Sequence, residues 1–263
     1  MSFTSPSRPF AATAAYYHFR APYAPAAINF LVETFALDAS ARVLDLGCGP
    51  GTLTLPLAAA AGEVVAVDPE PQMLGEARIA ADAAGRDNIR WLCARAEDLP
   101  ADIGRVRLAT LGQSFHWMDR DAVLAALAQI IEPGGGVALV NPGRRRPQES
   151  WEDLADAVVV RFLGPRQPQA ARHAEPEHEP ALRRSSHFNR FEAHVFTTEF
   201  ARDIASVVGA VHSLSYAARS RFGDRAAAFE AALTEALLAQ NPSGRFRERV
   251  ETEVIVARRV ANQ

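Results

Sequence analysis

The chain has 263 residues, of which 48% are hydrophobic and 22% are charged, and its formal net charge is −3. This composition is ordinary for one globular α/β domain with a sizeable core, and it gives no overall attraction to nucleic acid or to an anionic membrane. The net charge therefore favours small substrates over polymers. No apolar run approaches the roughly 20 residues of a membrane span and the N-terminus has no pattern of a signal peptide, so we expect a cytoplasmic protein.

The first 40 residues are expected to form an extended or partly helical leader, followed by one amphipathic helix over about 26–35. The leader concentrates aromatic side chains around one cation: Tyr16, Tyr17, Arg20 and Tyr23. Two roles remain open for it. It can be an anchor that packs onto the core, or a lid over a bound ligand, because lids also need apolar anchors.

A glycine-rich turn between two apolar runs is the most informative motif. The run over 42–46 ends at Gly47-Cys48-Gly49-Pro50-Gly51, and the run over 63–68 ends at Asp68, which predicts a β-α-β unit with a ligand crevice at its strand ends. A dinucleotide site would carry a third glycine where Thr52 stands, and Asp45 would repel a phosphate. The pattern favours a cationic ligand with a ribose.

Strand-like and helix-like runs alternate regularly from residue 42 to residue 142, as a parallel sheet with crossover helices requires. We expect strands near 42–46, 63–68, 89–94, 106–111 and 136–141, and helices near 52–60, 71–84 and 119–130. The turn Pro133-Gly134-Gly135-Gly136 should precede the fifth strand.

The composition changes after residue 143. The cluster Arg144-Arg145-Arg146 is expected to be solvated surface, and a helix over 151–163 should lead into a mobile loop over 164–182 beside the substrate pocket. The remainder predicts helices over 200–213 and 224–239, and strands near 190–197 and 253–257. These two strands should form an antiparallel edge on the parallel sheet.

The glycine turn with Asp45 before it and Asp68 after it resembles the class I S-adenosylmethionine (SAM) dependent methyltransferases. The run Phe115-His116-Trp117 after the fourth strand is similar to the methyltransferase-11 group, which acts on small molecules. The resemblance implies a doubly wound, Rossmann-like, seven-stranded, mostly parallel sheet with an antiparallel C-terminal edge. A single domain over 1–263 would comprise an N-terminal helical lid (1–40), a SAM-binding core (41–143), a substrate-side insertion (144–200), and C-terminal helices with the last strand (201–263).

The resemblance also implies roles for individual residues. Asp45 suits the ammonium end of the methionine moiety of SAM, and Asp68 suits the ribose hydroxyls. The remaining cofactor residues are expected to be those that approach the methionine part or flank the adenine: Gly47, Cys48, Gly49, Gly51, Pro69, Met73, Ala96, Glu97 and Gln113. Acceptor binding is expected from the lid and the later strand ends, through Tyr16, Tyr17, Arg20, Tyr23, Trp117 and Asn141.

The sulfonium of SAM already activates its methyl group for transfer, so the protein mainly has to align an acceptor with that methyl group and exclude water. All 28 basic residues are arginine, which excludes lysine chemistry. His116 is the candidate general base, and a structural histidine that supports its loop is the alternative. The two cysteines and the His/Glu/Pro run over 173–180 lack the pattern of a metal site, so no metal is expected.

The predicted function is therefore SAM-dependent methylation of an O or N atom of a small molecule, in specialised metabolism such as antibiotic biosynthesis, with S-adenosylhomocysteine as product. We expect a monomer or homodimer with no nucleic-acid or membrane partner. Two alternatives remain. The chain could methylate a macromolecule, tRNA or a protein, through the cluster Arg144 to Arg146, or it could be a catalytically silent methyltransferase-like binding module.

Overall fold

The computed structural model describes residues 12–142, 150–165 and 178–260. Contacts between Cα atoms divide the chain into two compact units. One, here the sheet unit, comprises Pro22–Arg144, Glu175–Thr198 and Val250–Gln263. The other, here the helical unit, comprises Met1–Ala21, Arg145–Ala174 and Glu199–Arg249. The boundaries therefore differ from the four contiguous segments predicted from the sequence, and the predicted lid is divided between Ala21 and Pro22.

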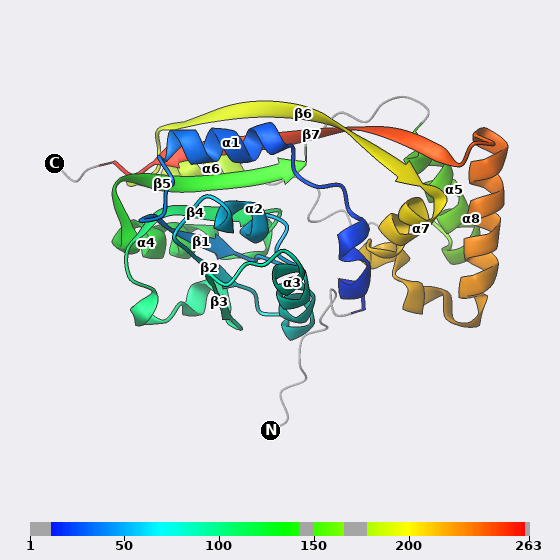
Figure 1. The fold of residues 1–263 in the computed structure, drawn as a ribbon, viewed down its shortest axis with the longest axis horizontal. Helices are drawn as coiled ribbons and strands as arrows, with labels where there is room; N and C mark the ends of the chain where they lie inside the picture. The colour runs from blue at the N-terminus through cyan, green and yellow to red at the C-terminus, as the bar shows by residue number, and fades with distance from the viewer. Residues whose placement is uncertain (1–11, 143–149, 166–177, 261–263) are drawn as a thin grey trace, which may run out of the picture. The chain divides into compact units, whose positions relative to one another are not determined.

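Seven strands form one sheet in the order β3-β2-β1-β4-β5-β7-β6 (Figure 1). Their bounds are β1 Arg42–Leu46, β2 Glu63–Val67, β3 Ile89–Leu92, β4 Val106–Gly112, β5 Ile131–Pro142, β6 Phe191–Asp203 and β7 Arg245–Arg258. Strands β1 to β5 pair in parallel, and β7 pairs with β5 in the antiparallel direction. The predicted seven-stranded, mostly parallel sheet with an antiparallel C-terminal edge is confirmed.

The helices of the sheet unit follow from sequence signals at their ends. They are α1 Pro25–Thr34, α2 Thr54–Ala58, α3 Pro71–Ala83, α4 Arg120–Ile130 and α6 His178–Arg184. Proline opens α1 and α3, where its missing N–H costs no hydrogen bond. Asp119 caps α4 by accepting a hydrogen bond from the Ala122 amide at 3.1 Å. These helices confirm the predicted alternation with the strands.

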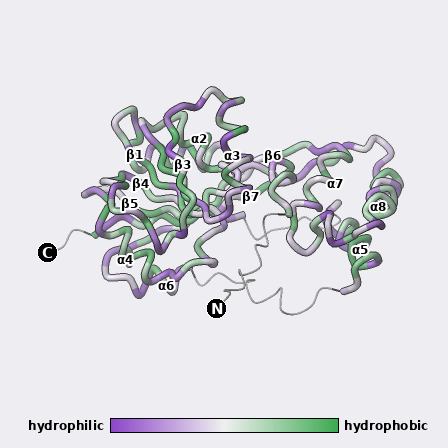
Figure 2. The backbone as a smooth tube through the Cα atoms, turned by 90° about the horizontal axis from the view of Figure 1, so that it is seen from below, coloured by the Kyte–Doolittle hydropathy of each residue, from purple (hydrophilic) through white to green (hydrophobic). Residues whose placement is uncertain are grey.

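Apolar side chains on both faces of the sheet form the core of this unit. One buried cluster joins the strands to α4 and α6, and a second joins them to α1 and α2. The run from Val64 to Val67 is buried at every position, as expected for a parallel strand that is covered on both faces. In Figure 2 the hydrophobic colour runs along β1, β4 and β5. None of the described helices is long and apolar enough to cross a membrane.

Three elements differ from the sequence predictions. Strand β5 starts at Ile131, so the turn Pro133–Gly136 lies inside it, where the pairing register shifts between Val106 and Leu108 of β4. Strand β7 starts at residue 245 instead of 253. Strand β6 extends to Asp203, whose side chain then caps the next helix by accepting from the Ser206 amide at 2.8 Å, so that helix starts at 204 instead of 200.

The loop predicted over 164–182 lies mostly outside the described residues. Its last part is helical instead, because α6 begins at His178. Ala181 and Leu182 of this helix are buried in the core cluster that includes α4. The cluster Arg144 to Arg146 also lies outside the described residues.

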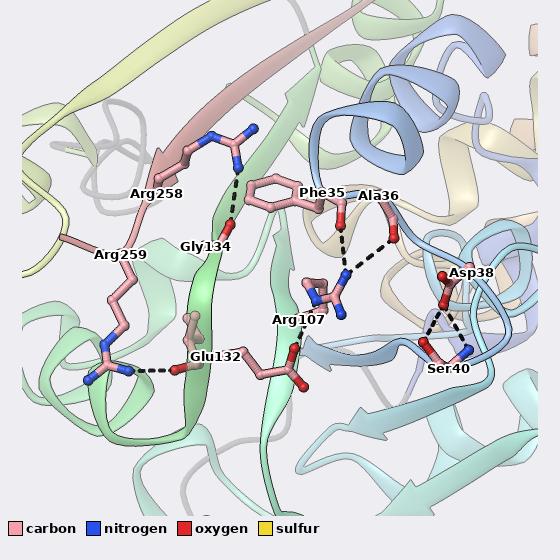
Figure 3. A network of polar contacts seen from close by, with 10 residues as sticks. Phe35, Ala36, Asp38, Ser40, Arg107, Glu132, Gly134, Arg258 and Arg259 are labelled. Atoms are coloured by element: carbon pink, nitrogen blue, oxygen red, sulfur yellow. Dashed lines mark hydrogen bonds and ion pairs between the residues drawn. The ribbon is translucent and has the colours of Figure 1, made fainter. Parts of the chain in front are cut away.

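Three arginines bind main-chain carbonyls at the amino ends of the parallel strands (Figure 3). Arg107 stands near the start of β4, and Arg258 and Arg259 stand at the end of the antiparallel β7. Their guanidinium groups donate over 2.6–3.5 Å to the carbonyl oxygens of Thr34, Phe35, Ala36, Ile131 and Gly134. These bonds tie the end of α1 and the start of β5 to the sheet, and they use the several donors that a guanidinium offers.

The helical unit contains the 3₁₀ helix η1 Ala14–Phe19 and the helices α5 Trp151–Leu163, α7 Ile204–His212 and α8 Ala226–Gln240. Its apolar core includes Val207, Phe222, Phe229 and Leu233. Two arginines fasten the leader to this core. Arg20 donates to the Ser213 carbonyl at 2.8 Å, and the buried Arg202 donates to the Phe19 carbonyl at 2.6 Å. The leader therefore has the contacts of an anchor, and its role as a lid stays a prediction.

The close approach of β5 to β7 can be tested at Gly136. A Cβ atom at this position would lie 2.3 Å from the Ala257 carbonyl oxygen and 2.8 Å from the Phe35 ring, so Gly136→Ala should destabilise the protein by about 1–3 kcal/mol. Gly75 is the control, because it lies inside α3 and a Cβ atom added there would meet nothing within 4 Å beyond its chain neighbours and the adjacent backbone of the helix. Gly75→Ala should stabilise by about 1 kcal/mol. Urea unfolding measures both, and equal effects would contradict the packing described.

Candidate functional site

The glycine turn lies at the carboxyl end of β1, where the backbone folds back onto β2. The Gly47 and Cys48 amides donate to the Val67 carbonyl at 2.8 and 3.0 Å. Gly47 has φ +66°, and a Cβ atom there would lie 2.4 Å from the Ser114 Cβ, so this position needs glycine. The thiol of Cys48 is buried, and burial raises its pKa. The turn is therefore tightly packed at Gly47, whereas Gly49 has open space where a Cβ atom would stand.

Asp68 closes the turn from the end of β2. Its Oδ2 accepts a hydrogen bond from the Gly49 amide at 2.9 Å, and its Oδ1 accepts one from the Glu70 amide at 2.8 Å. The side chain is 8% exposed, and desolvation raises its pKa. Each carboxylate oxygen can accept a second hydrogen bond, so Asp68 can still bind ligand hydroxyls while it holds the turn.

Asp45 is buried directly beneath the turn, with 1% of its surface exposed. Its Oδ2 accepts from the Thr54 hydroxyl at 2.6 Å, and its Oδ1 accepts from the Thr110 hydroxyl at 2.9 Å. Desolvation raises the pKa of Asp45 to about 6, with a further contribution from the charge of Asp68, although the two hydroxyls act in the opposite direction. A cation bound nearby would favour the charged form.

Thr54 and Thr110 are site residues that the sequence analysis did not identify. Thr54 begins α2 and Thr110 lies within β4, and both side chains are fully buried. The sequence signal that could have indicated this site is Thr110, a hydroxyl residue inside the apolar run of β4. That pattern alone does not reveal which acid the hydroxyl faces, because Asp45 is 65 residues away in the sequence.

The ends of β4 and β5 provide two further polar positions. Gln113 has φ +51°, which is uncommon for a residue with a side chain, and its amide donates to the Val140 carbonyl at 3.0 Å. Asn141 is 9% exposed, and within the described residues nothing accepts a hydrogen bond from its Nδ2. A buried donor without an acceptor is costly, which is typical of a group kept for a ligand.

His116 lies in a short 3₁₀ helix, Phe115–Trp117, directly after β4. Its ring is half-buried and lies 5.1 Å from the Trp117 ring and 6.5 Å from the buried His178 ring, between centroids. Trp117 is 45% exposed, whereas Phe115 belongs to the core. The position at the carboxyl end of a parallel strand agrees with a place near a ligand, and the role of His116 as base stays a prediction.

Residues expected near an adenine have mixed environments. Met73 and Ala96 are buried. Glu97 accepts hydrogen bonds from the Asp119 amide at 3.0 Å and from Arg95 at 3.3 Å. Desolvation acts to raise the pKa of Glu97, but these hydrogen bonds outweigh it and the pKa is lowered. Glu97 therefore already supports the start of α4, and a contact with a ligand stays a prediction.

The four residues of the predicted lid belong to different units. Tyr16, Tyr17 and Arg20 belong to the helical unit, where Arg20 lies over the Tyr17 ring at 3.9 Å. Tyr23 belongs to the sheet unit, and its hydroxyl is 2.9 Å from where a Cβ on Gly112 would stand. Across the part of the chain that the structure describes, no group of three or more His, Cys, Asp or Glu residues could hold a metal ion.

Comparisons with known proteins give a consistent result. Residues 43–135 match a family model described as a methyltransferase domain. An uncharacterized methyltransferase of Mycobacterium bovis is 37% identical over 129 residues, which is 49% of this chain and 49% of that protein. The chain thus spans about half the length of the curated relatives it matches.

Two solved structures resemble nearly the whole chain. A protein of Anaeromyxobacter dehalogenans, provisionally assigned as a type II methyltransferase, is 28% identical with a TM-score of 0.62, over 93% of this chain and 99% of that one. A SAM-dependent methyltransferase of Thiobacillus denitrificans, solved with S-adenosyl-L-homocysteine, is 20% identical with a TM-score of 0.54, over 98% of this chain and 100% of that one. The second likeness is one of fold alone.

The raised pKa of Asp45 predicts a pH-dependent stability. A carboxyl group with a folded pKa of about 6 and an unfolded value of 3.8 stabilises the fold most below about pH 4, and this contribution is lost as the pH rises through 6. The loss amounts to about 3 kcal/mol. Asp45→Asn removes this titration, so the variant should gain stability relative to the wild type between about pH 4.5 and about pH 7. Urea unfolding across that range measures the difference.

Asp38 supplies the control for this experiment. It is an exposed carboxylate whose pKa is lowered, first by the Ser40 hydroxyl, so it stays ionised over the same range. Asp38→Asn should therefore follow the pH profile of the wild type. If Asp45→Asn also runs parallel to the wild type, the proton of Asp45 is not linked to folding.

The orphan donor of Asn141 predicts a variant that is more stable than the wild type. Asn141→Leu removes a buried N–H group that has no acceptor in the described part of the chain, and should stabilise the protein by about 1 kcal/mol. Asn88 is the matched control, because its Nδ2 donates to the Ala58 and Ala61 carbonyls, each at 2.9 Å. Asn88→Leu should destabilise. Denaturant unfolding of both variants checks the opposite signs, and a destabilised Asn141→Leu would show that the amide is already satisfied.

Proposed function

We propose that this chain, which carries a class I methyltransferase domain, binds SAM at the glycine turn and catalyses methyl transfer to an O or N atom of a small molecule. The observation that carries the proposal is the pair of buried acids, Asp45 and Asp68, behind a turn that exposes backbone to a ligand. Such a site favours a cation with hydroxyl groups over a phosphate. Relatives of the same fold, one solved with S-adenosyl-L-homocysteine, support it.

The residues present fit this cofactor. Asp68 can bind ribose hydroxyls through the lone pairs that the Gly49 and Glu70 amides leave unused. Asp45 acts mainly through its charge, because both of its oxygens already accept from threonine hydroxyls and little of it is exposed. That charge favours the cationic methionine end. The other predicted cofactor residues, Met73 and Gln113 among them, belong to the same proposal.

When bound, SAM supplies a methyl group on an activated sulfonium. The protein has to hold the acceptor in line and keep water out. In this proposal the Asn141 amide donates a hydrogen bond to an acceptor oxygen or nitrogen, and Trp117 offers an exposed apolar wall. His116 removes the acceptor proton where the acceptor has one to lose. Asn141→Leu should accordingly lower turnover while it raises stability.

A role in specialised metabolism, a cytoplasmic location and a monomeric or homodimeric state are parts of this proposal that rest on the sequence. The net charge of −3 supports a small acceptor over RNA or DNA. Methylation of tRNA would instead require a basic surface. Arg144 to Arg146 remain the sequence feature that favours this alternative.

Calorimetry with S-adenosylhomocysteine tests the cofactor assignment. Asp68→Ala should weaken binding at least tenfold, because hydrogen bonds to a charged group contribute about 1.5–3 kcal/mol. Asp102→Ala is the control, since this exposed carboxylate pairs with Arg90 at 2.7 Å. The affinity of this variant for S-adenosylhomocysteine should match that of the wild type. Far-UV circular dichroism establishes that Asp68→Ala is folded. Equal dissociation constants for the wild type and Asp68→Ala would refute the site.

A further inference from the structure

The guanidinium group of Arg120 lies at the carboxyl edge of the sheet, where this residue begins α4. Among the described residues, no oxygen atom accepts a hydrogen bond from this guanidinium and no acid forms an ion pair with it. Its Nε atom is nevertheless buried, although the side chain as a whole is only half-buried. A buried donor that is left unpaired costs free energy. Such a donor is typical of a position where a ligand supplies the acceptor.

The two acids that flank Arg120 in the chain serve other groups. Asp119 accepts a hydrogen bond from the Ala122 amide at 3.1 Å, where the positive end of α4 offsets its charge. Asp121 pairs with Arg184 at 3.3 Å. The charge of Arg120 therefore stays available to a ligand. Both acids repel a second negative charge, so a single carboxylate is favoured over a dianion such as a phosphate ester.

The Phe115 ring supports the guanidinium from the core side. Arg120 Cζ lies 6.0 Å from the centroid of this ring, and Phe115 is 1% exposed and belongs to the core cluster shared with α4. A cation over an aromatic face is favourable, and a ring packed in the core has little freedom to move. The two terminal amino groups of Arg120, unlike Nε, are not buried, so a ligand can reach them from solvent. A guanidinium held in this way can present two parallel N–H groups to a carboxylate.

A second buried donor lies on the same face of the sheet. Leu139 of β5 belongs to the core cluster that includes Phe115 and the side chains of α4. Because side chains alternate along a strand, Asn141 points to that same face, two residues after Leu139. Its Nδ2 also has no acceptor among the described residues. The ends of β4 and β5 are adjacent, since Gly112 pairs with Val140, so both donors border one region of the carboxyl edge.

We propose that the methyl acceptor is a small carboxylic acid whose carboxylate binds the terminal amino groups of Arg120. The acid then lies on the α4 face of the sheet, where His116 follows Phe115 in one 3₁₀ turn and where Asn141 points. A neutral acceptor of the same shape would lose the charge-assisted hydrogen bonds to the guanidinium. The inference rests on the proposed function in naming the bound acid as the acceptor, whereas the anion site depends on Arg120 alone.

Calorimetry of the full chain with benzoate, with and without S-adenosylhomocysteine, tests the proposal. Benzoate is a small monoanion whose ring can lie against the exposed Trp117. It should bind, and benzamide, which has the same shape and no charge, should bind at least tenfold more weakly. Arg120→Gln should weaken benzoate binding at least tenfold. Arg105→Gln is the matched control, because it removes the same charge from the opposite edge of the sheet, where Arg105 donates to the Gln129 carbonyl at 3.1 Å. It should change the affinity less than twofold.

Two further measurements separate this inference from a structural role of Arg120 and from the proposed function. Arg120→Gln should unfold at the same or a higher temperature than the wild type, because it removes a buried N–H group that has no acceptor among the described residues. It should also bind S-adenosylhomocysteine with the affinity of the wild type. A lower unfolding temperature would show a structural role and overturn the inference.

The inference is also overturned if the wild type binds S-adenosylhomocysteine but not benzoate, if benzamide binds as well as benzoate, or if Arg120→Gln and Arg105→Gln bind benzoate equally. A wild type that binds benzoate through Arg120 but does not bind S-adenosylhomocysteine would instead refute the proposed function.

Discussion

The burial of Asp45 is the constraint on which the ligand edge of the sheet depends. A carboxylate with 1% exposure is costly to desolvate, and two threonine hydroxyls offset part of that cost. Because Thr54 begins α2 and Thr110 lies in β4, the acid joins three elements that meet beneath the glycine turn. The same burial raises the pKa of Asp45 to about 6, so the turn sits over a group that a cation would ionise. The charge of Asp45 is therefore the feature beneath the turn that a cationic ligand would meet.

Asp68 adds a second acid to the edge in a different environment. Its two oxygens hold the Gly49 and Glu70 amides, which shape the turn and the entrance to α3. Desolvation raises the pKa of Asp68, and the charge of Asp68 contributes to the raised pKa of Asp45. Both acids are desolvated, and the charge of Asp68 also hinders the ionisation of Asp45. A ligand with a sulfonium and an ammonium would be attracted to these two acids, whereas a pyrophosphate would be repelled, which agrees with the argument made from Asp45 and Thr52 in the sequence.

The sequence predicts the core of the sheet well because buried parallel strands carry a strong local signal. The runs over 42–46 and 63–67 are apolar on both faces and end in glycine or aspartate, so the strands and their site residues are readable. The extensions of β6 and β7 alternate polar and apolar residues outside the buried core, and the sequence analysis assigned their residues to a helix or to no element. Contacts across long separations were not predictable either. Nothing near Arg20 indicates that its guanidinium binds Ser213, 193 residues away, nor near Asp45 that Thr110 is its partner.

Charge is distributed unequally between the two edges of the sheet, and helix ends explain why. At the amino edge, Arg107 and Arg258 donate to the last carbonyls of α1, where a cation opposes the negative end of the helix dipole. At the carboxyl edge, Asp68 accepts from the amide that precedes α3, where an anion is favoured. Arginine suits the first task better than lysine, because one guanidinium bridges two carbonyls, as Arg258 does between Thr34 and Gly134. The absence of lysine thus costs the amino edge nothing, and the buried acids Asp45 and Asp68 at the carboxyl edge are the groups that the proposed cationic ligand would meet.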